Sequence, residues 1–392
     1  MIPKNSFDFR MKSYEIDYNT QRQRVLFEKY GVLENPFPAA GQTFGHPHLE
    51  TDIDKNIENC IDEFENGSQK TQVLVIEGTQ GVGKTNLLNY YLMELEDLYQ
   101  DDKTFYIIRY YPDPEPSFDA IIRKIFQELE EIHLEKIANK LKCLPEKECL
   151  AIIDFAKGYE VRLVLHSLWQ AASIGEEHLK QVSFLAISLL LGSRLLKRHK
   201  VTLGVRFRLD TVESKTQALR DIIDVSVKLG ILRGIFLLLD ELEKQHDSLN
   251  KTPAIRYLSA IRALIDALHT HLFLMLALTL EARRRYFTML PAMAGRLQNV
   301  NTLNPLKNVG EATELYQLYL NETRRKAKMN EKISSWICGT HQIFSEHDIS
   351  LRFQALSATS ANLGIKGVTH RDFLNELQES TQAKFRELFE NL

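Results

Sequence analysis

The residues Gly78-Thr79-Gln80-Gly81-Val82-Gly83-Lys84-Thr85 decide the fold of this 392-residue chain. They follow a short apolar run, Val73 to Ile76, and precede a helical pattern from Leu87 to Leu98. An apolar run of this kind is typical of a strand buried on both faces of a parallel sheet. Glycines let consecutive backbone N–H groups turn toward an anion, and the N-terminus of the next helix adds a partial positive charge. The stretch therefore predicts a phosphate-binding loop between a buried strand and a helix.

The loop matches the P-loop pattern, and the strand before it and the helix after it are the context that supports such a match. Lys84 is expected to bind the β and γ phosphates of ATP, and Thr85 to offer its hydroxyl to Mg2+. ATP and Mg2+ are therefore the expected cofactors. The residues expected to contact the nucleotide are Gly78, Thr79, Gln80, Gly81, Val82, Gly83, Lys84, Thr85 and Asn86.

A second apolar run, Ile235 to Leu239, ends in the two carboxylates Asp240 and Glu241. Ligands bind at the carboxyl ends of the strands in open parallel sheets, and this arrangement looks like a Walker B motif. Asp240 is expected to hold Mg2+, and Glu241 to polarise the attacking water. Acidic residues after an apolar strand also occur as solvated turn residues, so this alternative stays open.

Two later segments add a polar strand end and an arginine. The apolar run Leu272 to Leu278 ends at Thr279, and Leu290 to Leu297 contains Arg296. Together with the P-loop and the IFLLLDELE strand, these segments resemble AAA+ ATPases of the initiator and helicase-loader type. Ala218 to Glu243 followed by Leu290 to Leu297 is similar to the ATP-binding subunits of BREX-like bacterial phage-defence systems.

The resemblance implies roles for both residues. Thr279 stands where such proteins place the sensor-1 residue, between the γ phosphate and water. The sequence Thr279-Leu280-Glu281 departs from the threonine-proline that they commonly carry. Arg296 stands in the arginine-finger segment, and a finger commonly acts in a neighbouring subunit's site, which implies an oligomer. The expected catalytic residues are thus Lys84, Glu241, Thr279 and Arg296.

Simpler explanations stay open for these two residues and for a further arginine. A threonine that ends a strand is commonly structural, and arginines on a helix are commonly solvated. Arg371, just after the expected helix cap Thr369, is a candidate second sensor or a solvated residue. The alternatives to Arg296 as the finger are Arg283, Arg284 and Arg285.

The order of these patterns predicts an α/β fold, a P-loop NTPase of AAA+-like type with a parallel sheet flanked by helices. Further strands are expected at Phe105 to Tyr110 and, from weak alternation, at Val201 to Leu209. In the N-terminal arm, Tyr30 to Phe37 and Phe44 to His46 would contact adenine or simply pack the arm. The expected domains are this arm (1–50), an ATPase core (51–135 and 201–306), a helical insertion (136–200) and a C-terminal helical or winged-helix domain (307–392).

Composition places the chain among folded globular proteins, with 44% hydrophobic and 26% charged residues. A formal net charge of -3 argues against a surface that coats nucleic acid throughout. The four cysteines lack the spacing of a zinc site. Met1 to Tyr14 is too polar for a secretory signal, and Val182 to Leu196 is too short and too polar to span a bilayer. A cytoplasmic location without a membrane partner is expected.

A basic stretch allows local contact with DNA despite the negative net charge. The resemblance implies a homo-oligomer that acts on DNA, or on a partner such as a helicase or another defence-system subunit. The leading hypothesis is an ATPase that assembles on DNA and loads or regulates that partner. A nucleotide-gated signalling ATPase of the STAND kind is the alternative, and a small-molecule kinase is disfavoured because no substrate lid is found. The basic residues are Arg194, Lys197, Arg198, His199, Lys200, Arg206 and Arg208.

Overall fold

The computed structural model describes residues 20–39, 45–66, 70–111, 119–240, 251–362 and 366–390. The chain divides into two compact units. The first comprises residues 1–50, 79–90 and 303–392, and the second comprises 51–78 and 91–302. The division falls within the P-loop, after Gly78. The domain ranges expected from the sequence stay predictions, because they were drawn around an ATPase core rather than around compact units.

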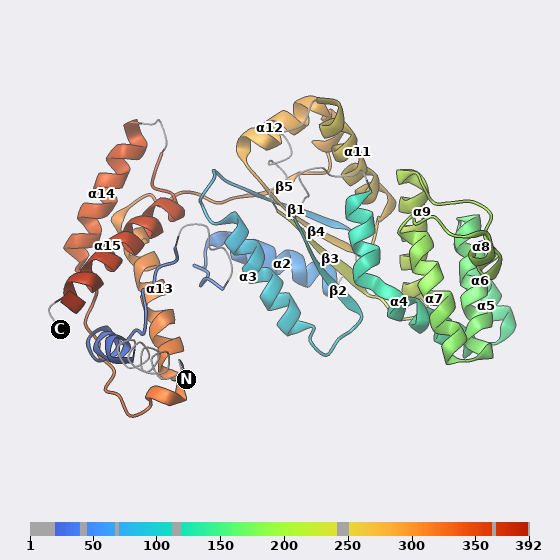
Figure 1. The fold of residues 1–392 in the computed structure, drawn as a ribbon. Helices are drawn as coiled ribbons and strands as arrows, with labels where there is room; N and C mark the ends of the chain where they lie inside the picture. Colours follow the sequence, from blue (N-terminus) through green and yellow to red (C-terminus); the bar gives the residue numbers. More distant parts are fainter. Residues whose placement is uncertain are drawn as a thin grey trace, which may run out of the picture. The chain divides into compact units, whose positions relative to one another are not determined.

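The second unit contains a five-stranded parallel sheet in the order β2-β3-β4-β1-β5 (Figure 1). The strand that precedes the P-loop therefore lies between β4 and β5, and β4 separates it from β3. The strands are β1 (Gln72–Glu77), β2 (Phe105–Tyr110), β3 (Gly234–Leu239), β4 (Leu272–Leu278) and β5 (Asn299–Thr302).

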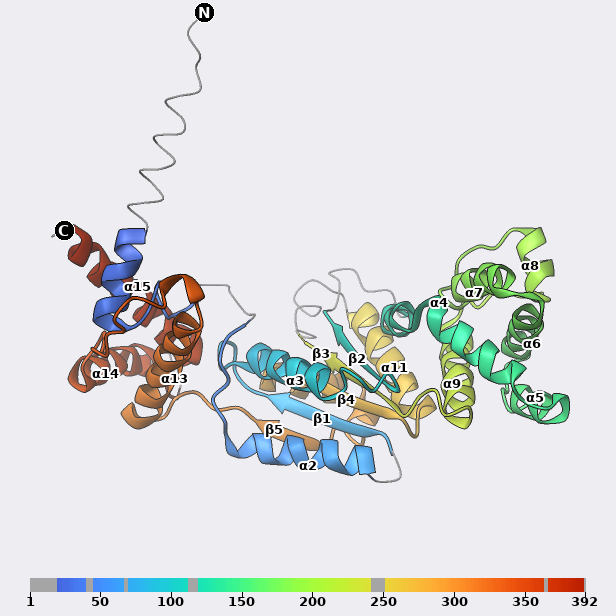
Figure 2. The same ribbon diagram turned by 90° about the horizontal axis from the view of Figure 1, so that it is seen from below.

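The central strands are apolar because both of their faces are covered, as expected for a parallel sheet. Side chains on a strand alternate between faces, and Phe236 and Phe273 turn to the face where Phe64 of α2 (Asp52–Asn66) lies, with ring centroids at 5.3 and 5.7 Å. Alternate residues on the opposite face join a cluster with α9 (Val212–Lys228) and α11 (Lys251–Ala267). Figures 1 and 2 show α2 and α11 on opposite sides of the sheet.

Other helices lie between consecutive strands of the sheet. The helix α3 (Lys84–Leu98) follows the P-loop. After β4 come α12 (Leu280–Met289) and the short η1 (Pro291–Met293), which lead to the edge strand β5.

The helical insertion forms a bundle in which α4, α6 and α7 pack on one another (Figures 1 and 2). Their buried leucine, isoleucine and valine side chains are continuous with the core over the sheet. The helices are α4 (Ala120–Lys142), α5 (Glu146–Ile153), α6 (Tyr159–Ile174), α7 (Glu176–Leu190) and α8 (Lys197–Leu203).

The strand expected at Val201 to Leu209 is wrong. The helix α8 continues to Leu203 and ends at Gly204, whose φ of 67° is a left-handed conformation that glycine adopts readily. Val205 and Leu209 are buried and the residues between them are exposed. The alternation of apolar and polar residues thus comes from a loop that packs two side chains against the bundle. The described strands do not pair with this loop.

The first unit is helical in its described part. Residues 20–30 form a helix, and the later elements are α13 (Val309–Lys328), η2 (Glu331–Ile333), α14 (Glu346–Asn362) and α15 (His370–Glu390). Tyr30 stacks on Phe385 at 5.7 Å, and Phe37 stacks on Tyr316 at 5.6 Å. Tyr30 and Phe37 of the N-terminal arm therefore belong to the core of this unit.

The expected fold class is confirmed: the chain has a parallel sheet flanked by helices, a helical insertion and a helical C-terminal region. Of the two alternatives for residues 307–392, the described part is helical. None of the helices that the structure describes has the length and apolar character needed to cross a bilayer.

His133 of α4 is fully buried between the sheet and α9. Its Nε2 lies 2.8 Å from Ser226 Oγ, and its Nδ1 lies 3.0 Å from Tyr106 Oη. The Ser226 hydroxyl donates to the carbonyl of Ile222, so Ser226 accepts a hydrogen bond from Nε2–H, and Nδ1 accepts one from Tyr106. Burial holds the pKa of this neutral histidine down to about 4.

We predict that folding stability falls on acidification through this group. The folded pKa lies below the unfolded value, so the contribution of neutral His133 is complete above about pH 6.5 and is lost as the pH falls toward 4. The loss is about 1.4 kcal/mol per pH unit in that window. Urea unfolding of wild type and His133→Gln at pH 7.5 and 5.5 measures it, with His178→Gln as control. An equal acid loss in His133→Gln and wild type would contradict the prediction.

Candidate functional site

The P-loop has the backbone conformation that its glycines predict. Gly81 and Gly83 have φ of 85° and 98°, which side chains other than hydrogen rarely allow. Among the described residues, none accepts a hydrogen bond from the backbone N–H of Gly81, Val82, Gly83 or Thr85. Because these donors lie at the N-terminus of α3, the loop fits a phosphate group.

The two side chains expected to bind the nucleotide lie at the start of α3. Lys84 is 8% exposed, and its Nζ donates to the carbonyl of Thr79 at 3.1 Å, so the ammonium group lies folded over the loop. The Thr85 hydroxyl makes no hydrogen bond within the described ranges and is half-buried. A cation over the loop and a hydroxyl beside it fit a triphosphate with its Mg2+.

The end of the N-terminal arm contacts the first turns of α3. The Nδ2 of Asn86 donates to the carbonyl of Pro47 at 3.0 Å, and His48 stacks on Tyr90 at 4.4 Å. The N-terminal arm thus lies beside the first turns of α3, which is the neighbourhood in which adenine contacts are expected. Phe44, which is part of the same expectation, lies outside the described residues.

The N-terminus of α15 holds the backbone of the loop. His370 Nδ1 donates to the carbonyl of Val82 at 2.6 Å, and the backbone N–H of Arg371 donates to the carbonyl of Gly81 at 3.0 Å. Burial lowers the pKa of His370. Thr369 Oγ1 accepts from the backbone N–H of Asp372 at 3.1 Å, so the expected helix cap is present. The Arg371 side chain is exposed, and its role as a second sensor stays a prediction.

Three expected site residues meet at one edge of the sheet in the second unit. The order β3-β4-β1 places the carboxyl ends of these strands side by side, and Asp240, Thr279 and Gly78 follow them in that order. The backbone N–H of Gly78 donates to the carbonyl of Leu278 at 3.2 Å, which extends the ladder past the end of β1. Thr279 therefore lies on the strand between the P-loop strand and the Asp240 strand.

Thr279 caps α12. Its Oγ1 accepts a hydrogen bond from the backbone N–H of Ala282 at 3.1 Å. The structural role that the sequence left open is thus present. A hydroxyl that accepts in a cap keeps its hydrogen for donation, so a second role as sensor stays a prediction.

Asp240 is buried in an ion pair that the sequence analysis missed. Arg109 Nη2 lies 2.8 Å from Asp240 Oδ2, and their side chains are 8% and 2% exposed. The Arg109 guanidinium also lies over the Tyr111 ring, 4.7 Å from its centroid. Arg109 is the only charged residue in FYIIRY. Because an arginine in a buried strand needs a carboxylate as partner, this lone charge could have predicted an ion pair with an acidic residue. Glu241, the expected partner of water, lies outside the described residues.

Arg296 is held within its own chain. Its Nε and Nη2 donate to both oxygens of Asp266 at 2.5 and 2.9 Å, and its Nη1 donates to the carbonyl of Ala292 at 2.7 Å. The hydrogen bond from Arg296 is the main reason that the pKa of Asp266 lies below its ordinary value. An arginine finger at this position would have to leave this bidentate pair.

The alternative arginines differ in their contacts. Arg283 forms an ion pair with the buried Glu77. Arg284 and Arg285 are exposed, and the described residues offer neither of them an ion-pair partner. They are therefore the arginines of this segment that are available to a neighbouring molecule.

Known proteins resemble the chain distantly. No family model and no curated protein matches it. Two solved structures of the ORC2 protein of Aeropyrum pernix are similar. The one described as ADPNP-ADP complexes has 12% identity and a TM-score of 0.38, covering 86% of this chain and 70% of that chain. The ADP form has 13% identity and a TM-score of 0.40, covering 90% and 73%. Similarity at this level carries no conclusion about function.

No group of three or more His, Cys, Asp or Glu side chains in the described ranges could hold a metal ion. A hydroxyl and a single carboxylate are, in contrast, the donors that Mg2+ uses when phosphates supply the remaining oxygens. The Thr85 hydroxyl and the Asp240 carboxylate are each donors of these types.

We predict that Arg109→Met destabilises the protein by about 3–5 kcal/mol, because it leaves the buried Asp240 carboxylate without its cation. Replacing both partners, in Arg109→Met with Asp240→Leu, is expected to restore most of that stability. Urea unfolding measures the free energies.

The matched control is Arg233→Met, which removes a partly exposed pair with Asp102 at 3.3 Å. Such pairs contribute less than about 1 kcal/mol. If Arg109→Met costs no more than Arg233→Met, the pair does not neutralise a buried charge as described.

Proposed function

We propose that this protein is an ATPase that binds ATP with Mg2+ at the P-loop, oligomerises, and acts on DNA or regulates a DNA-processing partner. The main support is the P-loop itself. Its backbone N–H groups at the start of a helix have no acceptor among the described residues, and Lys84 is folded over them. Thr279 and Asp240, at the carboxyl ends of neighbouring strands, fit the remaining chemistry.

Each residue has a stated task in this proposal. The N–H groups of the loop and Lys84 bind and orient the phosphates, and Thr85 and Asp240 are the ligands of Mg2+. The ion, when bound, neutralises charge on the β and γ oxygens. Glu241 orients and polarises the attacking water, and Thr279 donates its hydroxyl hydrogen near the γ phosphate.

The action on DNA and the partner are supported by the resemblance to initiator and helicase-loader ATPases. A role in phage defence rests on the narrower resemblance to BREX-like subunits. A STAND-type signalling ATPase without direct action on DNA is the competing proposal, because it needs the same P-loop.

The decisive experiment compares ATP turnover by wild type, Lys84→Ala and Glu241→Gln, with and without single- and double-stranded DNA, at low and physiological salt. Lys84→Ala is expected to lower turnover by at least about 100-fold, because it removes a charged donor from the phosphates. Glu241→Gln is expected to lose turnover and keep nucleotide binding, measured with a fluorescent ATP analogue.

Unchanged turnover in Lys84→Ala would refute the ATPase assignment. Turnover in wild type that DNA does not alter at either salt concentration would favour the STAND-type switch. Stimulation by DNA that Glu241→Gln abolishes would support the DNA-acting ATPase.

The arginine finger is tested by subunit mixing. We expect Arg284→Ala with Arg285→Ala to lose turnover and keep ATP binding, because these arginines are exposed and unpaired in the described part of the chain. Mixing this variant with Glu241→Gln should restore part of the activity, since a site with both groups then forms between subunits. If Arg296→Ala instead loses turnover, and mixing it with Glu241→Gln restores activity, the finger is Arg296.

A further inference from the structure

A basic cleft of about 460 Å3 lies in the helical insertion. It forms where the end of α7, the following loop, α8 and the loop after α8 come together. Its described lining contains no carboxylate. The charged residues that line it are Arg194, Lys197, Lys200 and Arg208.

Within the described part of the chain, no ion pair compensates the positive charge in the cleft. Arg194 and Lys197 are exposed, and neither has an ion-pair partner among the residues described. Lys200 and Arg208 donate to backbone carbonyls, which carry no net charge. Four cations gathered in one cleft repel one another, so an anion there would relieve this repulsion. The Glu160 carboxylate lies beside the loop after α8, but it accepts hydrogen bonds from the backbone N–H groups of Arg206 and Phe207 rather than from these cations.

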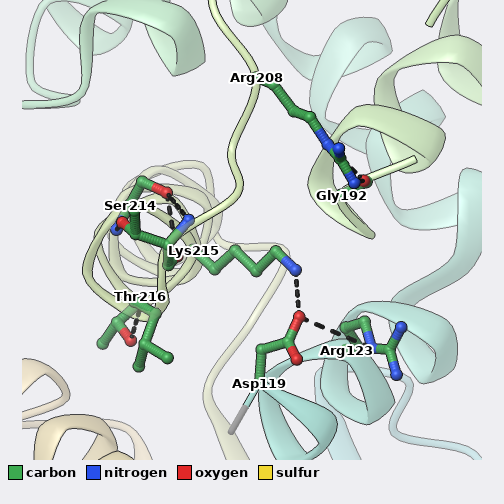
Figure 3. A network of polar contacts seen from close by, with 9 residues as sticks. Asp119, Arg123, Gly192, Arg208, Ser214, Lys215 and Thr216 are labelled. Carbon is green, nitrogen blue, oxygen red and sulfur yellow. Dashed lines mark hydrogen bonds and ion pairs between the residues drawn. The ribbon is translucent and has the colours of Figure 1, made fainter. Parts of the chain in front are cut away.

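A lysine nearby shows the opposite arrangement. Figure 3 shows Lys215 directed at Asp119, which also faces Arg123. Lys215 is buried, and its ion pair links α9 to the start of α4. The bundle therefore neutralises the cation it buries and leaves the cations of the cleft open.

Arg208 has a fixed orientation in the cleft. Its Nε and Nη2 both donate to the carbonyl of Gly192, at 2.9 and 2.6 Å (Figure 3). This contact satisfies a carbonyl just after α7, where a cation is favourable. A guanidinium has five N–H donors, so the remaining ones, Nη1 included, stay available to a ligand at a fixed place.

The size and surroundings of the cleft indicate the class of anion. Its volume lies in the range of small-molecule sites, which suits one phosphate with its sugar and base. Basic residues continue beyond it at Arg198 and Arg206, as a chain of phosphates requires. Phe207, beside Arg208 in the chain, is 68% exposed, and exposed aromatic rings stack on unpaired bases.

We propose that this cleft binds the phosphate backbone of a single-stranded nucleic acid, with Phe207 stacking on a base. The proposal names a contact site for the DNA of the proposed function and rests on that part of it. Basal ATP turnover, measured without DNA, does not depend on the cleft.

The test is fluorescence anisotropy of a labelled oligothymidylate with the full chain over a range of salt concentrations. Arg194→Glu with Lys197→Glu should weaken binding by at least about tenfold and lower the salt slope by about 1.4, or 0.7 for each lost phosphate contact. The matched control is Lys140→Glu with Lys147→Glu, which reverses two exposed charges elsewhere in the insertion. Phe207→Ala should weaken binding to oligothymidylate more than binding to duplex DNA.

Unchanged affinity and salt slope in Arg194→Glu with Lys197→Glu would overturn the proposal, as would equal loss in the control. A second arm uses calorimetry of tripolyphosphate with Lys84→Ala, which removes the P-loop site. In one outcome, tripolyphosphate binds only when Arg194 and Lys197 are present, and wild type does not bind oligothymidylate. The ligand of the cleft would then be a small anion and not a nucleic acid. Because ATP turnover is measured separately, failure here is distinguishable from failure of the ATPase assignment.

Discussion

The ladder between β1 and β4 is the constraint on which the rest of the second unit depends. It pairs Gln72 with Phe273 through Glu77 with Leu278 and continues to Gly78. Because the strands are parallel, every following loop emerges at one edge. The strand order therefore brings the polar residues after β1, β4 and β3 close together, and no attraction between their side chains is needed. A strand pairing in another order would leave the same residues in the sequence and separate them in space.

Buried charges in the second unit occur in ion pairs. Asp240 with Arg109, Glu77 with Arg283 and Lys215 with Asp119 are all ion pairs with a buried member. Desolvation cancels much of the Coulomb energy of such pairs, so they contribute little net stability and strongly disfavour structures in which a partner is missing. Arg109 thus sets the position of Asp240, and Lys215 joins α9 to α4.

The sequence was most informative where a pattern has a single physical cause. The strands at Phe105–Tyr110 and Leu272–Leu278 occur with the predicted bounds, because largely apolar runs of this length are stable when helices cover both faces of a sheet. The edge strand β5, Asn299–Thr302, was not predicted. It is polar, and Asn301 bonds to Asn56 across 2.7 Å, so its place in the sheet depends on a distant residue that no local pattern contains.

The sequence by itself determined the P-loop, because its glycines, Lys84 and the flanking patterns act within a few residues of one another. It also indicated the carboxylates and the threonine that end the apolar strands. Only the tertiary structure decided the partners of Asp240, Arg296 and Gly81, namely Arg109, Asp266 and the start of α15. Each of those contacts joins residues at least 30 positions apart, and which distant groups meet depends on strand order and helix packing rather than on local propensity.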